Sequence, residues 1–182
     1  MKGLGKTTIQ FLCVCSLLCL QESNANNNSL AGHWKLLPEK SSSIDPWRTL
    51  TLDIRLQKDT IIMVKTFSAG NQHDVRRDSI GVSTEGKEQI VPIPSGRWLG
   101  GVSMGVYYGS ASVRRLRARW NADESQLSID FREVLETSQG VTEITVNQTF
   151  AISSDGSTLT LTEARSTRAA SPMRYEFVRL TE

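Results

Sequence analysis

The sequence predicts an all-β domain, an antiparallel up-and-down barrel of roughly eight to ten strands. Three observations support this fold class. Apolar and polar residues alternate along most of the chain after residue 29, and turn-forming residues separate the alternating segments at short intervals. The same region has no convincing 3.6-residue apolar period, so no helix is expected there. Short connections between neighbouring segments favour sequential hairpins.

The start of the chain has the layout of a secretory signal peptide. A short basic region with Lys2 and Lys6 precedes an apolar run from Ile9 to Leu20, and a polar, Asn-rich stretch follows. The run is shorter than the roughly 20 apolar residues that a membrane-spanning helix needs. We therefore expect an export signal and no transmembrane span in the mature chain.

All three cysteines lie within the first nineteen residues, which leaves two interpretations of this head. Small residues three and one positions before a cut after Ala25 fit ordinary cleavage, with residues 1–25 as signal peptide and 26–182 as one mature domain. Lipidation at Cys19 is the alternative, although the bulky Leu18 precedes it where a small side chain is preferred. Either way we expect an exported protein, periplasmic or secreted, with anchoring as the less favoured case.

The first strands follow from period-two alternation. The segment 49–56 places four aliphatic residues on one face and Thr, Asp and Arg on the other. A turn at Lys58 and Asp59 leads into a second β-rich segment at 60–67. The next segment, 74–82, is more polar, which favours an edge strand.

The clearest hairpin joins the segments 113–120 and 126–135. Their apolar faces align when Trp120 lies opposite Leu127. The same register brings two arginines opposite two acidic residues, and opposite charges across a ladder favour it: Arg117 with Asp130 and Arg114 with Glu133.

The last part of the sequence predicts three more strands. Residues 144–152 alternate between an apolar face and a face of Glu, Thr and Asn, and a turn at 154–157 leads into 158–162. A final strand carries alternating aromatic residues around position 176. The second faces of these strands are charged or hydroxylated, which excludes a barrel that faces lipid.

Composition excludes several function classes. The net charge of the chain is +2, so no global field favours nucleic acid. Without cysteine after residue 19, cysteine-based metal or nucleophile chemistry is excluded from the mature domain. The two histidines, His33 and His73, have no second ligand at metal-binding spacing, and no nucleotide-binding or hydrolase motif is present. We expect no cofactor, no metal and no enzymatic activity.

Three short motifs in a fixed order carry a family resemblance. They are Gly32-His33-Trp34-Lys35-Leu36, Gly86-Lys87-Glu88 and the late turn from Ser153 to Thr160. Together they resemble a group of uncharacterised exported bacterial lipocalin-like proteins. The resemblance implies a barrel that holds one small apolar or amphipathic ligand. It also implies that a late arginine lies over Trp34 at the barrel end, with Arg179 favoured and Arg174 as second choice.

Aromatic residues are the candidates for lining a ligand cavity. Three of them lie in a Gly-rich stretch where the chain departs from the family pattern, and they are equally consistent with ligand contact or packing: Trp98, Tyr107 and Tyr108. Five others lie on expected inward faces, where core packing is the more common role: Trp120, Phe131, Phe150, Tyr175 and Phe177.

The arginines Arg115, Arg117 and Arg119 share the outward face of one strand. A solvated face is the ordinary interpretation, and an acidic partner in the cell envelope is the functional one.

Two alternatives to ligand binding stay open. One is a structural or interaction module of the envelope with a filled core, and the other is an enzyme with His33 or His73 beside a carboxylate or nucleophile in a pocket.

Overall fold

The computed structural model describes residues 30–70, 75–94, 96–97, 106–109, 112–167 and 171–181. In these residues twelve strands pair in antiparallel fashion within one sheet. They are β1 (Gly32–Leu36), β2 (Thr49–Gln57), β3 (Thr60–Ser68), β4 (Val75–Ser83), β5 (Gln89–Pro92), β6 (Gly96–Arg97), β7 (Tyr107–Tyr108), β8 (Val113–Trp120), β9 (Gln126–Thr137), β10 (Gly140–Ile152), β11 (Thr158–Arg165) and β12 (Met173–Arg179). A single 3-10 turn, η1 (Pro38–Lys40), follows β1.

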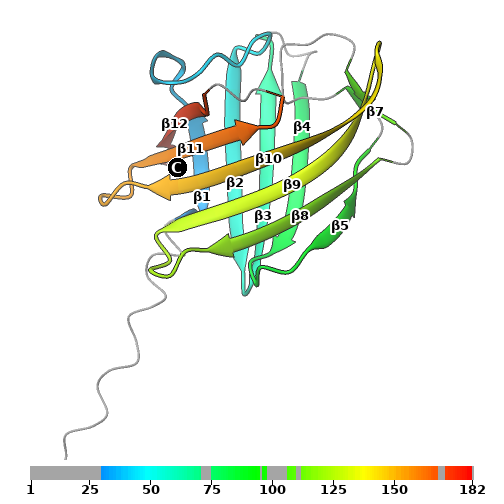
Figure 1. The fold of residues 1–182 in the computed structure, drawn as a ribbon. Helices are drawn as coiled ribbons and strands as arrows, with labels where there is room; N and C mark the ends of the chain where they lie inside the picture. The colour runs from blue at the N-terminus through cyan, green and yellow to red at the C-terminus, as the bar shows by residue number, and fades with distance from the viewer. Residues whose placement is uncertain are drawn as a thin grey trace, which may run out of the picture.

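Sequential hairpins build the barrel, as the sequence predicts. The sheet runs β4-β3-β2-β1-β12-β11-β10-β9, and β8 and β5 continue it beyond β9. The pairing of β1 with β12 joins the beginning of the described chain to its end. Figure 1 shows β1–β4 as one wall, with β8–β11 crossing obliquely in front of it. The all-β, nearly closed antiparallel barrel confirms the predicted fold class.

The predicted strands have close counterparts, and their register is confirmed. Trp120 pairs with Leu127, Arg117 with Asp130, and Arg114 with Glu133. The polar segment predicted as an edge strand is β4, which pairs with β3 and ends the sheet order. Strands β5, β6 and β7 were missing from the prediction, because they are two to four residues long and show little alternation.

Side chains and one isolated main-chain bridge, rather than a continuous ladder, connect β4 and the turn after it with β5 and β8. On β4, the Ser83 backbone N–H donates to Gln89 Oε1 on β5 at 3.1 Å, and Gln89 Nε2 donates back to the Ser83 carbonyl at 3.3 Å. Farther along the seam, Arg114 Nη1 on β8 lies 3.2 Å from Asp78 Oδ1 on β4. In the described residues, polar side-chain contacts therefore join β4 to β5 and β8 where β4 and β8 form no backbone ladder.

One end of the barrel is closed by Trp34. Its side chain is fully buried and its Nε1–H donates to the Leu30 carbonyl at 3.1 Å. The Arg179 guanidinium lies 4.1 Å from the centre of the indole ring and donates to the carbonyl oxygens of Ala31 and Gly156. A Cβ at Gly32, whose φ is +145°, would collide with Arg179, so this position requires glycine.

The main apolar core includes Trp34 and extends along the inward faces of most of the longer strands. Inward residues such as Leu52, Met63, Phe150 and Phe177 have at most 1% of their surface exposed. A second, smaller apolar cluster of Leu135, Ile144 and Val146 lies toward the opposite end. Among the residues described, no helix has the length and apolar character needed to cross a membrane.

Candidate ligand-binding site

The interior is polar between the two apolar clusters. Eight inward side chains from six strands and from β7 form what we call the interior polar cluster: Lys65, Asp78, Tyr108, Arg114, Glu133, Gln148, Glu163 and Arg165. Apart from Tyr108, whose strand is only two residues long, each keeps the period-two phase of its strand's buried apolar residues and therefore points inward. Charges inside a β-barrel are unusual enough to make this the leading candidate for a functional site.

Arg114 is the centre of one half of the cluster. Its side chain is 6% exposed and pairs with Glu133, whose side chain is 1% exposed. Tyr108 Oη donates to Glu133 Oε2 at 3.0 Å and accepts from Arg114 Nη2 at 3.4 Å. The guanidinium carbon also lies 5.2 Å from the centre of the Phe131 ring, a cation–π contact. These contacts leave the buried guanidinium well compensated.

Lys65 lies in the other half of the cluster. Its Nζ donates to Gln148 Oε1 at 3.0 Å, and Gln148 Nε2 in turn donates to Glu163. Arg165 Nε donates to the second oxygen of Glu163 at 2.6 Å. A relay of hydrogen bonds thus connects a lysine on β3 to an arginine on β11, across the inside of the barrel.

Burial shifts the acid–base behaviour of both halves. Desolvation lowers the pKa of Lys65 below its ordinary value, and this outweighs the attraction of Glu163 and Asp78. Burial and the nearby Glu133 raise the pKa of Tyr108, so its hydroxyl stays protonated and acts as a donor. Burial alone would lower the pKa of Arg114, but Asp78 and Glu133 hold it above its ordinary value.

Solvent still reaches this part of the interior. Lys65 and Phe131 point into the barrel and are only half-buried. The side chains of Asp78 and Arg165 are 28% and 12% exposed. Phe131 packs against both apolar clusters, so an apolar surface adjoins the charged one. The arrangement offers polar contacts and an apolar wall at the same place.

The aromatic candidates from the sequence fall into different environments. Phe150 and Phe177 are fully buried in the main core, Tyr175 is 6% exposed, and Trp120 packs at the margin of that core. Of the remaining candidates, Phe131 and Tyr108 adjoin the interior polar cluster. Tyr107 is 50% exposed on β7, and Trp98 lies outside the described residues.

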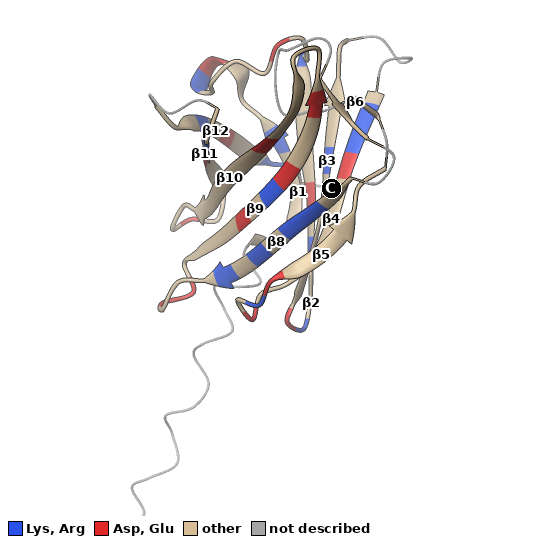
Figure 2. Ribbon diagram, turned by 45° about the vertical axis from the view of Figure 1, so that its right-hand side comes forward, with Lys and Arg blue, Asp and Glu red and all other residues tan. Residues whose placement is uncertain are grey.

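Three of the four arginines of β8, a strand that is largely blue in Figure 2, form a stripe on the outside of the barrel. Arg115, Arg117 and Arg119 are exposed, as their position on the strand predicts. Acidic residues stand beside them: Glu88 Oε1 lies 3.6 Å from Arg115, and Asp130 faces Arg117. The stripe is therefore partly neutralised, which fits a solvated face at least as well as an acidic partner.

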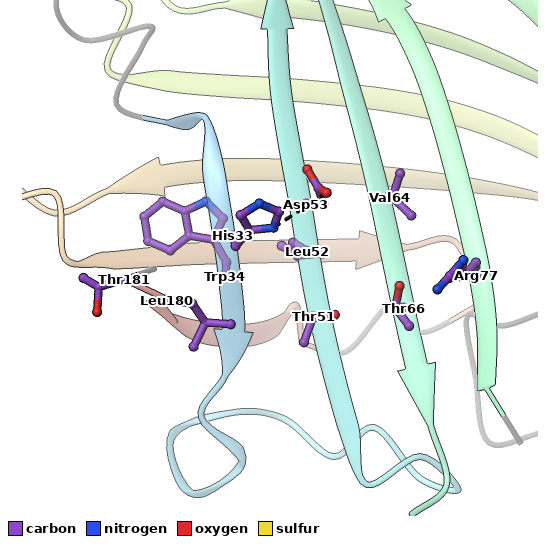
Figure 3. A pocket seen from close by; sticks show the side chains of 10 residues that line it. All are labelled: His33, Trp34, Thr51, Leu52, Asp53, Val64, Thr66, Arg77, Leu180 and Thr181. Carbon is purple, nitrogen blue, oxygen red and sulfur yellow. Dashed lines mark ion pairs between the residues drawn. The ribbon is translucent and has the colours of Figure 1, made fainter. Parts of the chain in front are cut away.

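A separate open groove of about 590 Å³ lies on the outer face of β1–β4 (Figure 3). It places His33 beside Asp53, with Nδ1 3.6 Å from Oδ2, and Thr51, Thr66 and Arg77 nearby. The histidine side chain is 51% exposed, and Arg55 also pairs with Asp53 at 3.2 Å. An exposed His whose carboxylate neighbour is shared with an arginine is poorly organised for general-base catalysis.

Sequence reasoning missed most of the interior polar cluster. It paired Arg114 with Glu133 across the ladder, but it did not note that both share the phase of buried Leu116 and Ile129. That phase is the signal that identifies them. Lys65 carries the same signal, since it alternates with Met63 and Phe67.

Comparisons with known proteins leave the family open. No family model matches the chain, and no curated protein matches it. Among solved structures, the chain is similar to a fatty-acid-binding protein isolated from Manduca sexta, with 12% sequence identity and a TM-score of 0.42. This similarity covers 80% of the present chain and 96% of the other.

In the described residues, no group of three or more His, Cys, Asp or Glu side chains could hold a metal ion.

Proposed function

We propose that this protein binds a small amphipathic molecule inside the barrel, with its polar part at the interior polar cluster and its apolar part against Phe131. One observation carries the proposal: Lys65 within the cluster and Phe131 beside it point into the barrel and yet keep part of their surface accessible. Buried charges cost more free energy than apolar residues of similar shape in many folds, so their retention is consistent with a binding role.

The proposal includes export and a non-catalytic role. Support for export is the layout of residues 1–25 together with the cleavage pattern before Asn26. The motifs at Gly32 and Asp155 support membership of the exported lipocalin-like group. The exposed His33–Asp53 pair offers no organised catalytic base, which favours binding over catalysis.

A filled structural module is the second candidate, and one observation favours it. Phe150 and Phe177 in the main core have no exposed surface, so the space that they fill is not available to a ligand. Ligand binding and a filled structural module make different predictions only for the region around the interior polar cluster. A test must therefore report on Phe131 and not on the barrel as a whole.

Matched tryptophan reporters provide that test. Phe131→Trp places an indole at the interior polar cluster, and Val64→Trp places one in the outer groove, with the native tryptophans as a common background. Titration with a neutral dansyl-labelled alkyl chain should quench the emission of Phe131→Trp saturably, with a Kd of about 1–100 μM. The emission of Val64→Trp should hardly change. Quenching of Val64→Trp alone, or of neither variant, contradicts binding inside the barrel.

A further inference from the structure

The seam, along which β4 faces β5 and β8, is closed at one end by main-chain contacts. There the Gly86 N–H, in the segment between β4 and β5, donates to the Ala118 carbonyl of β8 at 2.9 Å. Glu85 and Arg119 form an isolated main-chain bridge beside it. Backbone contacts therefore hold the barrel wall together where β4 ends at Ser83.

The seam opens toward the other end of β4. The inward side chains of this strand become steadily more exposed from its end to its start: Val82 is fully buried, Ile80 is 5% exposed, Asp78 is 28% exposed and Arg76 is exposed. All four keep the same period-two phase, so the increase in exposure reflects the wall that faces them and not the direction in which they point. Along this stretch, the described residues form no ladder between β4 and β8.

The Asp78–Arg114 ion pair spans the open part of the seam. Arg114 Nη1 on β8 lies 3.2 Å from Asp78 Oδ1 on β4. When Asp78 moves away, Arg114 keeps its ion pair with Glu133 and its contact with the Phe131 ring. The buried guanidinium therefore stays compensated after the pair across the seam is broken.

Asp78 has a second cation beside it. It lies opposite Lys65 in the β3–β4 ladder, and both residues are on the inward face. Because residues opposite each other in an antiparallel ladder have Cα atoms about 4.5–5.5 Å apart, the Asp78 carboxylate can turn from Arg114 to Lys65. Asp78 thus has a partner of opposite charge whether the seam is closed or open.

The proposed binding site lies directly behind this ion pair. Arg114 contacts Glu133 of the interior polar cluster and Phe131 of the apolar wall. Lys65, the half-buried lysine of the cluster, faces Asp78. A molecule that passes between Asp78 and Arg114 therefore reaches the polar and the apolar surface of the site together.

We propose that the ligand enters the barrel between β4 and β8, and that the Asp78–Arg114 pair is the latch of this entrance. The strands separate at the Val75 end of β4, and the main-chain contacts near Gly86 form the hinge. This inference rests on the proposed function and concerns access to its site. An obstruction on the entry path changes the association and dissociation rates by the same factor and leaves Kd unchanged.

A reversible cross-link on the outer face tests the entrance without altering the interior. Ser79→Cys on β4 and Arg115→Cys on β8 each follow a latch residue by one position, point outward and are exposed. Both are introduced into the full chain with the Phe131→Trp reporter and with the three native cysteines replaced by Ser. A bifunctional methanethiosulfonate should slow uptake and release of the neutral dansyl-labelled alkyl chain by about tenfold, and reduction should restore both rates.

A cross-link across a continuous ladder is the matched control. Thr149 and Thr162 lie opposite each other on the outer face of the β10–β11 ladder. The same reagent on Thr149→Cys/Thr162→Cys joins two strands that the backbone already holds together. It should leave both rates unchanged.

Asp78→Asn tests the latch itself, because it removes the charge and keeps the size of the side chain. The association rate constant, measured by stopped-flow quenching of Phe131→Trp, should rise several-fold. Glu163→Gln removes a carboxylate of the same cluster that pairs with Arg165 on β11, away from the seam. It should not raise the association rate constant.

The outcomes separate this inference from the proposed function. If the cross-link between β4 and β8 leaves both rates unchanged, or slows them no more than the control cross-link does, the seam is not the entrance and ligand binding stands. An association rate constant of Asp78→Asn at or below that of the unmodified reporter protein overturns the latch. Failure of the dansyl-labelled chain to bind the protein without a cross-link overturns the proposed function, and this inference with it.

Discussion

Replacement of Glu133 by Ala is expected to lower the free energy of unfolding by about 3–5 kcal/mol, because it leaves a buried guanidinium without its closest counter-ion. Glu133 is 1% exposed and pairs with Arg114. Without Glu133, the counter-ion that Arg114 keeps among the described residues is the partly exposed Asp78. Tyr108 also loses the acceptor of its hydroxyl. Urea denaturation of the variant and the wild type measures the difference.

Asp130 provides the matched control on the same strand. It points to the outer face of β9, where it accepts a hydrogen bond from Asn147 at 2.7 Å. Asp130→Ala should cost less than about 1 kcal/mol, as surface substitutions usually do. Equal losses in the two variants would show that the interior pair is no more important than a surface contact.

The double variant Arg114→Met/Glu133→Leu connects this prediction to function. When both charges are replaced by apolar residues of similar volume, stability should return to near the wild-type value or exceed it. The affinity of the dansyl probe should then change, since the interior polar cluster has lost two of its six charged side chains. A double variant that is as unstable as Glu133→Ala would assign the pair a structural role.

Trp34→Ala is expected to cost about 3–5 kcal/mol, the usual range for removal of a buried aromatic side chain. The indole is fully buried, donates to the Leu30 carbonyl and lies under Arg179. Its loss leaves a cavity at the closed end of the barrel and removes the surface on which the guanidinium rests. Thermal and urea unfolding of the variant both measure the effect.

Trp120→Ala is the control for Trp34→Ala, because it removes the same side chain from a half-buried position on β8. We expect it to cost clearly less, since fewer neighbours surround it and solvent can occupy the space. If the two variants lose the same stability, Trp34 does not close the barrel end in the way that its burial indicates.

The sequence predicts the parts of the structure that depend on local periodicity. The alternation of apolar and polar residues predicts the longer strands. Opposite charges on facing strands favour the β8–β9 register that brings Arg114 opposite Glu133. The resemblance carried by the Gly32–Trp34 motif implies an arginine over the indole, and Arg179 makes that contact while Arg174 pairs with Glu176. These features require only neighbouring strands or a short motif.

The interior polar cluster depends on contacts that local periodicity does not encode. Lys65 on β3 and Gln148 on β10 are 83 positions apart and meet because the barrel nearly closes. Asp78 and Arg114 meet across the seam where no ladder is described. Trp47 reaches the core from an irregular connection between β1 and β2. Such pairs follow from the closure of the sheet, which a single strand pattern does not fix.

Amide chemical-shift mapping of the isotope-labelled protein during titration with the neutral dansyl-labelled alkyl chain tests the central claim most directly. The account predicts saturable shifts that centre on Lys65, Arg114, Phe131 and Gln148, with little change at His33, Asp53 and Thr66 on the outer face. Shifts that centre on the outer groove, or an unchanged spectrum at a saturating concentration of the dansyl-labelled chain, would contradict ligand binding at the interior polar cluster.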